Sequence, residues 1–94
     1  FRSWWDDLNE IRSKIQKGRM SIQKGNYDTA MQEYQTVAEK YPYFPEAQYY
    51  MGLTKFRQKD FEGAAFYFNE ALNLYPSHEK SRKGLNNVKK RLRK

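Results

Sequence analysis

The feature that most limits the fold of this chain is an internal repeat with a period of 34 residues. Residues 11–44 align with residues 45–78 without a gap, and the aligned positions keep their chemical character. The matched pairs are Gly18 and Gly52, Ala30 and Ala64, Tyr27 and Phe61, Tyr34 and Phe68, Asn26 and Asp60, Tyr41 and Tyr75, and Pro42 and Pro76. Such a repeat predicts a stack of similar units, each of which buries its apolar face against the next.

Each unit is predicted to contain two helices joined by a short turn. We expect first helices over 11–24 and 45–59, and second helices over 27–40 and 61–75. Gly25-Asn26 and Lys59-Asp60 supply the turns between them. Pro45 suits a first helical turn, where its missing N–H is no loss. Pro42 and Pro76 end the second helices, because proline cannot continue the hydrogen-bond ladder.

Small residues and aromatic rings have complementary places in this arrangement. Gly18 and Ala30 would let two antiparallel helices approach closely, and so would their counterparts in the second unit. Tyr27 and Tyr34 lie seven residues apart and therefore share one face of a helix. We expect their rings to fill the space that the small residues leave open.

This set of residues resembles the tetratricopeptide repeat, and the second unit is the closer match. Its small and aromatic positions are Gly52, Phe61, Ala64, Phe68 and Ala71, followed by Pro76. Gln48 stands where the family usually has Trp, and Val37 stands where the second unit has Ala71. The resemblance implies an all-α fold, a right-handed superhelix of antiparallel helix pairs with about five helices. It also implies a non-enzymatic protein–protein interaction module, an adaptor or scaffold.

Both ends of the repeat array depart from the family pattern. Lys14 and Lys17 replace the usual Trp and Leu, which help to pack against a preceding repeat, so we expect the array to open at residue 11. Leu85, Val88 and Leu92 form an apolar stripe on an otherwise polar helix. We therefore expect a basic capping helix over 79–94, in register with the first helix of a third unit. Because the sequence starts with Phe and not with Met, we expect a fragment or a processed product.

Residues 1–10 are predicted to continue the first helix towards the N-terminus, because no turn former precedes residue 11. Ser3 and Asp7 are both suited to cap its start. Three roles stay open for the apolar residues of this extension, which are Trp4, Trp5 and Leu8. Trp4 and Leu8 could pack on the domain, or all three could form a second interaction surface or a dimer contact. Trp4 and Trp5, with Phe1 and Arg2, could instead lie at a membrane interface next to an anchor outside this sequence.

In the family, the first helices of successive repeats line a concave groove that binds the partner. Carried over to this chain, the groove residues are Arg12, Ile15, Arg19, Ile22, Tyr49, Tyr50, Leu53, Phe56, Arg57, Lys80, Lys83 and Asn87. Tyr49 and Tyr50 point about 100° apart on a helix, so one core stripe cannot bury both. The alternative is that Phe56 and one of these tyrosines are packing residues. An aromatic floor with cations around it favours a peptide or helix with hydrophobic anchors and acidic flanks.

One subclass of ligand is disfavoured by the same comparison. Chaperone-binding members of the family hold a C-terminal carboxylate with Lys, Asn and Arg side chains. The matching positions are Ile15, Arg19, Tyr50, Lys80 and Gly84. Only Lys80 fits, so we expect no binding to the C-terminal tails of the major heat-shock chaperones.

The net charge of +7 belongs to the C-terminal segment, because residues 1–78 carry equal numbers of acidic and basic side chains. The cations of this segment are Lys80, Arg82, Lys83, Lys89, Lys90, Arg91, Arg93 and Lys94. We expect them to form the solvated face of the capping helix. An acidic protein surface or a membrane is the alternative. Nucleic acid is disfavoured, because no aromatic side chain lies among the cations to stack on bases.

The sequence holds few groups that could perform chemistry. It has no Cys and a single His, His78, for which we expect an exposed loop or a helix-start role after Pro76. No metal set can be built from these residues, and no glycine-rich phosphate loop occurs. We therefore predict neither enzymatic activity nor a cofactor. Self-association into a homo-oligomer is an alternative function. The compartment also stays open, and it could be the cytoplasm or a membrane surface.

Overall fold

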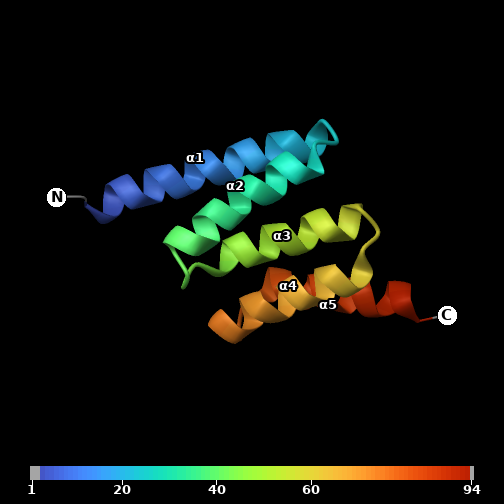
Figure 1. The fold of residues 1–94 in the computed structure, drawn as a ribbon. Coiled ribbons are helices and arrows are strands. Elements are labelled where there is room, and N and C mark those ends of the chain that lie inside the picture. The colour runs from blue at the N-terminus through green and yellow to red at the C-terminus, as the bar shows by residue number, and fades with distance from the viewer. Residues whose placement is uncertain (1–2, 94) are drawn as a thin grey trace.

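The computed structural model describes residues 3–93 of the chain, and five α-helices joined by short loops account for most of them. The helices are α1 (Trp4–Gln23), α2 (Tyr27–Lys40), α3 (Pro45–Arg57), α4 (Phe61–Leu74) and α5 (Glu79–Leu92) (Figure 1). No strand occurs within the described range. The all-α class and the two helices per repeat predicted from the sequence are therefore confirmed.

The helices form an elongated stack of 53 × 31 × 17 Å. Each helix packs against its neighbours in the chain, and α3 also contacts α1 and α5. The first helix of each repeat and α5 thus lie on one side of the stack, and α2 and α4 lie on the other. Figure 1 shows the α1–α2 pair beside the α3–α4 pair, with α5 packed on α4.

The helix boundaries follow the local signals in the sequence with small differences. Ser3 caps α1 by accepting a hydrogen bond from the Asp6 N–H, and the Asp6 carboxylate accepts from the Ser3 N–H. The first helices end one or two residues earlier than predicted, at residues 23 and 57. The reason is that Gly25 and Lys59 have positive φ angles of 81° and 65°, which a right-handed helix cannot contain. The second helix of the second repeat likewise ends at residue 74, before Tyr75.

Rings inserted opposite glycines hold the helices at close range. Tyr34 and Phe68 are fully buried. A Cβ atom built on Gly18 would lie 2.4 Å from the Tyr34 ring. The Phe68 ring is enclosed from two sides, because Cβ atoms on Gly52 and on Gly84 would each lie 2.6 Å from it. The expectation that rings occupy the space beside small residues is confirmed for Tyr34 and Phe68.

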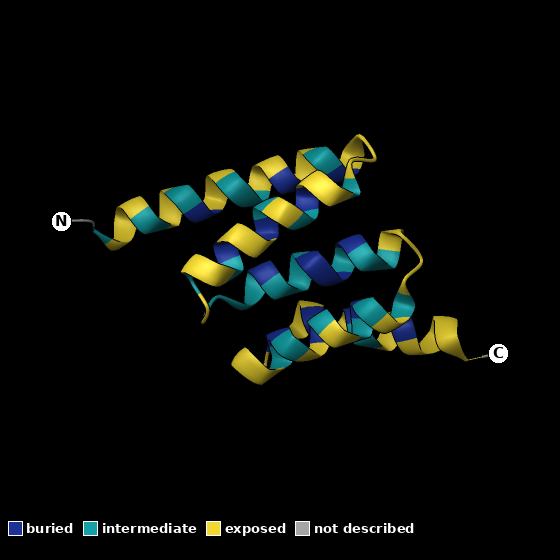
Figure 2. Cartoon of the chain, viewed as in Figure 1, coloured by how far each residue is buried: buried dark blue, intermediate teal, exposed yellow. Residues whose placement is uncertain are grey.

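The core runs along the stack as three connected clusters. One surrounds Tyr34, a second surrounds Val37, and the third surrounds Phe68. Figure 2 shows the buried residues on the faces where helices meet and exposed residues at both ends of the stack. Each fully buried ring of this size stabilises the fold by roughly 1.5–3 kcal/mol.

The first turns of α1 extend beyond the end of α2. The Tyr41 hydroxyl lies 3.1 Å from the Asp7 carboxylate and 2.9 Å from the Glu10 carboxylate, and Lys40 forms an ion pair of 2.9 Å with Glu10. These contacts attach the extension to the α2–α3 loop. They leave its apolar side chains uncovered, since Trp4 is 69% exposed and Trp5 is 55% exposed. Trp4 therefore does not pack on the domain, whereas Leu8 is partly covered and only 36% exposed.

The predicted capping helix is shorter than 79–94 and its apolar stripe is only partly buried. Val88 is fully buried and Leu85 is half-buried, but Leu92 is 52% exposed. The reason is that the last turn of α5 runs past the start of α4 (Figure 1). Lys94 lies outside the described residues.

Candidate protein-binding groove

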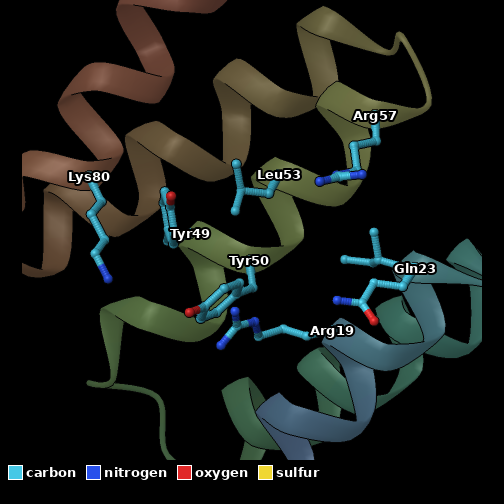
Figure 3. A pocket seen from close by; sticks show the side chains of 8 residues that line it. Arg19, Gln23, Tyr49, Tyr50, Leu53, Arg57 and Lys80 are labelled. Atoms are coloured by element: carbon cyan, nitrogen blue, oxygen red, sulfur yellow. The ribbon is translucent and has the colours of Figure 1, made fainter.

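Two adjoining cavities lie on the side of the stack formed by α1, α3 and α5. The first has a volume of about 260 Å³ and is lined by Arg19, Ile22, Gln23, Tyr49, Tyr50, Leu53, Arg57 and Lys80 (Figure 3). The second has a volume of about 340 Å³ and is lined by Ile11, Arg12, Ile15, Gln16, Arg19, Phe44, Glu46 and Tyr50. Arg19 and Tyr50 line both, so the two cavities adjoin, and we call them together the groove.

Most of the residues that the sequence assigns to a binding groove line this depression. Those that do are Arg12, Ile15, Arg19, Ile22, Tyr49, Tyr50, Leu53, Arg57 and Lys80. Phe56 does not, because it packs against Phe61 at a ring distance of 5.3 Å, and the Arg91 guanidinium lies 5.8 Å from its centre. Lys83 and Asn87 are exposed outside both cavities. The groove reaches only the first turn of α5, where Lys80 lies.

Tyr49 and Tyr50 form the floor of the groove and part of the core at once. The Tyr50 ring stacks on Tyr34 at 5.5 Å, and the Tyr49 ring lies 5.9 Å from Phe68. Both tyrosines are half-buried, so each has one side in the protein and the other in the groove. Burial, together with the neighbouring Tyr50 and Glu46, raises the pKa of Tyr49. The rings are therefore held in place before any ligand arrives.

His78 occupies a structural position beside the groove that differs from the expected exposed loop. It is only 7% exposed and caps α5, so the helix-start role is confirmed and the exposed position is wrong. Its Nδ1 accepts a hydrogen bond from the Ser81 N–H at 3.3 Å and lies 2.7 Å from the Ser81 hydroxyl. Its Nε2 lies 2.6 Å from the Glu46 carboxylate. Because Nδ1 accepts, Nε2 carries the proton and donates it towards Glu46.

The sequence contained one signal for this position. Phe44, which lies 34 residues before His78, is the N-cap residue of α3 in the same way that His78 is the N-cap residue of α5. Register therefore indicates a helix start at residue 78. The partner Glu46 lies in the first turn of α3, so the hydrogen bond joins the beginnings of two helices that flank the groove.

The groove is electropositive. Its cations are Arg12, Arg19, Arg57 and Lys80, and within residues 3–93 none of them forms an ion pair. Glu46 is the acid in its lining, and its carboxylate is engaged by His78. A ligand that carries carboxylates would therefore meet cations that are free to pair with it.

Residues 3–93 contain no group of three or more His, Asp or Glu side chains that could hold a metal ion. None of the five helices is both long and apolar enough to cross a lipid bilayer.

Comparison with known proteins gives two matches of one kind. A family model of the tetratricopeptide repeat matches residues 45–78, and a second model of the same repeat matches residues 15–42. No curated protein matches the chain. The matched ranges correspond to the α3–α4 pair and to most of the α1–α2 pair.

Proposed function

The chain belongs to the tetratricopeptide-repeat family, whose repeats are protein–protein interaction modules, and we propose that its groove binds a peptide or helix of a partner protein. The observation that carries this proposal is the floor made by Tyr49 and Tyr50. Both rings are half-buried, fixed by stacking and open on one side. Tyrosines held in this way offer a large contact area and a hydroxyl at a low cost in side-chain entropy.

The chemistry of the groove supports one class of ligand. Apolar side chains of Ile15, Ile22 and Leu53 lie beside the tyrosines and can receive hydrophobic anchors. Arg19 and Arg57 lie on different helices at the edge of the same cavity. The ligand is therefore a segment with aliphatic or aromatic anchors and acidic flanks, and the cations also speed its encounter with the groove.

Selection from a randomised peptide library tests this proposal. We expect enriched sequences in which acidic residues flank an aliphatic or aromatic residue, and we expect the variant Arg19→Glu/Arg57→Glu to bind the selected peptides at least ten-fold more weakly. Alanine variants of Tyr49 and Tyr50 are unsuitable, because these rings also support the core.

The matched control is Lys17→Glu/Lys24→Glu, which makes the same change in charge on exposed residues of α1 and its C-cap outside the groove. It should keep the wild-type affinity. A library without enrichment would contradict the proposal, and so would an equal loss of binding in the control.

Exposure of the two tryptophans favours a second candidate function. Trp4 and Trp5 lie edge to face at 5.7 Å on the part of α1 that extends beyond α2. We infer that they and Leu8 form a second interaction surface, used for self-association or for a partner. Since these are the two tryptophans of the chain, a blue shift of the fluorescence with rising protein concentration would support self-association there. A constant spectrum would exclude self-association through this surface.

A further inference from the structure

Acidic and basic side chains lie on different parts of the surface of this molecule. The helices on the side away from the groove, α2 and α4, carry the acids Asp28, Glu33, Glu39, Glu62 and Glu70, of which Glu33 pairs with Lys14 of α1. The only cation within these two helices is Lys40, and it pairs with Glu10. The cations of α5 and of the groove lie elsewhere on the molecule. The chain therefore presents an acidic face and a basic end that are separate from each other.

The acidic face contains a cavity of about 390 Å³ between α2, α3 and α4. On α3 it is lined by Gln48 and Met51, which point away from Tyr49 and Tyr50 because successive residues turn by about 100°. It therefore lies on the opposite side of α3 from the groove. We call it the back cavity.

The back cavity combines an apolar floor with acidic edges. Its apolar lining includes Met51, Phe66 and Tyr67, and Phe66 is 58% exposed although it is a large ring. Glu39 and Glu70 lie at its edges. Neither carboxylate forms an ion pair with another residue of the described chain. An occupant that fits this lining has one apolar side chain flanked by cations.

The chain itself carries such a segment at the end of α5. Leu92 is 52% exposed and lies between Arg91 and Arg93, and Lys89 and Lys90 precede it. This segment does not lie at its own back cavity, because the Arg91 guanidinium packs over Phe56 near the C-terminal end of α3. Gln48 in the back cavity is eight residues earlier on that helix, which corresponds to roughly 12 Å along its axis. A second copy of the chain can supply this segment to the back cavity.

We propose that the end of α5 of one copy docks in the back cavity of a second copy. Leu92 contacts Phe66 and Tyr67, and Arg91 and Arg93 pair with the carboxylates of Glu39 and Glu70. The two surfaces are different, so the contact is heterologous and each added copy offers the next free cavity. The groove takes no part in it. The net charge of +7 on every copy repels at long range, so the contact forms only at high protein concentration.

Sedimentation velocity over a concentration series tests this arrangement. From about 10 μM to about 1 mM, the range in which weak protein contacts are populated, the average mass of the wild type should rise past that of a dimer. The cavity variant is Glu39→Gln/Phe66→Ser/Glu70→Gln, and the tail variant is Arg91→Gln/Leu92→Ser/Arg93→Gln. Each should remain a monomer by itself, with unchanged circular dichroism.

Mixing the two variants gives the decisive result. The cavity variant keeps an intact tail and the tail variant keeps an intact cavity, so an equimolar mixture should form a dimer and nothing larger. A control variant, Asp28→Asn/Glu62→Gln, removes acids of the same two helices outside the cavity and should associate like the wild type.

Three results would overturn the proposal. They are a wild type that stays monomeric over the whole series, a mixture without dimers, and a control variant that fails to associate. Association that persists in the cavity variant and disappears in Trp4→Ser/Trp5→Ser would also overturn it, and would assign the contact to the tryptophan surface. Peptide binding in the groove is measured with other variants, so either proposal can fail without the other.

Discussion

Replacement of His78 by Ala should destabilise the fold by about 2.5 kcal/mol. The loss has two parts, because His78 both caps α5 and donates a hydrogen bond to Glu46. Removing the cap costs about 1 kcal/mol. Removing a hydrogen bond to a carboxylate costs about 1.5 kcal/mol, the low end of its range, since the Glu46 side chain is 30% exposed. For a domain of this size, the sum lowers the midpoint of thermal unfolding by roughly 10–20 °C.

Two further variants separate the two parts. His78→Asn keeps a good capping residue and should lose only the bond to Glu46, so its destabilisation should be about 1.5 kcal/mol. Glu46→Ala should cost a similar amount. In the double variant His78→Ala/Glu46→Ala the losses should not add, because both changes remove the same hydrogen bond. The assay is urea unfolding followed by circular dichroism at fixed pH.

A His78→Asn variant as unstable as His78→Ala would show that the cap contributes nothing measurable. Single losses that add in the double variant would show that the two side chains act independently, and either result would contradict the expected values. Lys80→Ala serves as the control, since this exposed residue lies in the same turn of α5 and forms no ion pair within residues 3–93. It should change the unfolding free energy by less than about 0.5 kcal/mol.

Three other substitutions follow from the packing and the backbone. Gly52→Ala places a Cβ atom 2.6 Å from the Phe68 ring. We therefore expect the free energy of unfolding in urea to fall by about 1–2 kcal/mol, although Ala has the better helix propensity. An unchanged urea midpoint would contradict the close packing. Tyr34→Phe removes a buried hydroxyl that has no hydrogen-bond partner within the described chain, so stability at neutral pH should rise by about 1 kcal/mol. Burial raises the pKa of Tyr34 from 10.0 to about 12, so the unfolded chain loses this proton at a lower pH than the folded chain. Between pH 10 and pH 12 the wild type should therefore lose more stability than Tyr34→Phe. Parallel curves of unfolding free energy against pH for the two proteins would rule this out. Lys59→Gly should stabilise by about 0.5–1 kcal/mol in thermal unfolding, since residue 59 has a φ of 65° and its counterpart in the first repeat is Gly25; a lower midpoint would count against backbone strain there.

Local signals and the repeat together were sufficient to predict the helices. The capping pattern at Ser3 and the position of Pro45 each act within one turn of the chain, whereas the 34-residue register relates the helices of one repeat to those of the other. The ends were less certain, because a left-handed residue such as Lys59 has no marker in its side chain. A glycine at this position would have indicated a left-handed conformation, as Gly25 does in the first repeat, but a lysine does not.

Contacts between distant residues set the limit of prediction at the candidate groove. Most of its lining follows from the position of the first helices in each repeat. Phe56 was misplaced because its nearest ring, Phe61, belongs to the next helix. The bond from His78 to Glu46 spans 32 residues and no pattern in the sequence connects them. The back cavity also went unpredicted, since Glu39 and Glu70 occupy unrelated positions in the two repeats.

The contacts between helices make α3 the central helix of the molecule, because it is the one that all four others contact. Across the described chain, the backbones of α1 and α2 come close to α3 but not to those of α4 and α5, and the backbones of α4 and α5 also come close to α3. The groove and the back cavity lie on opposite sides of this helix. A rotation of the two pairs about α3 therefore widens one depression as it narrows the other. A ligand that wedges the groove open would bring α2 and α4 closer, and the distance between spin labels on those two helices would record it.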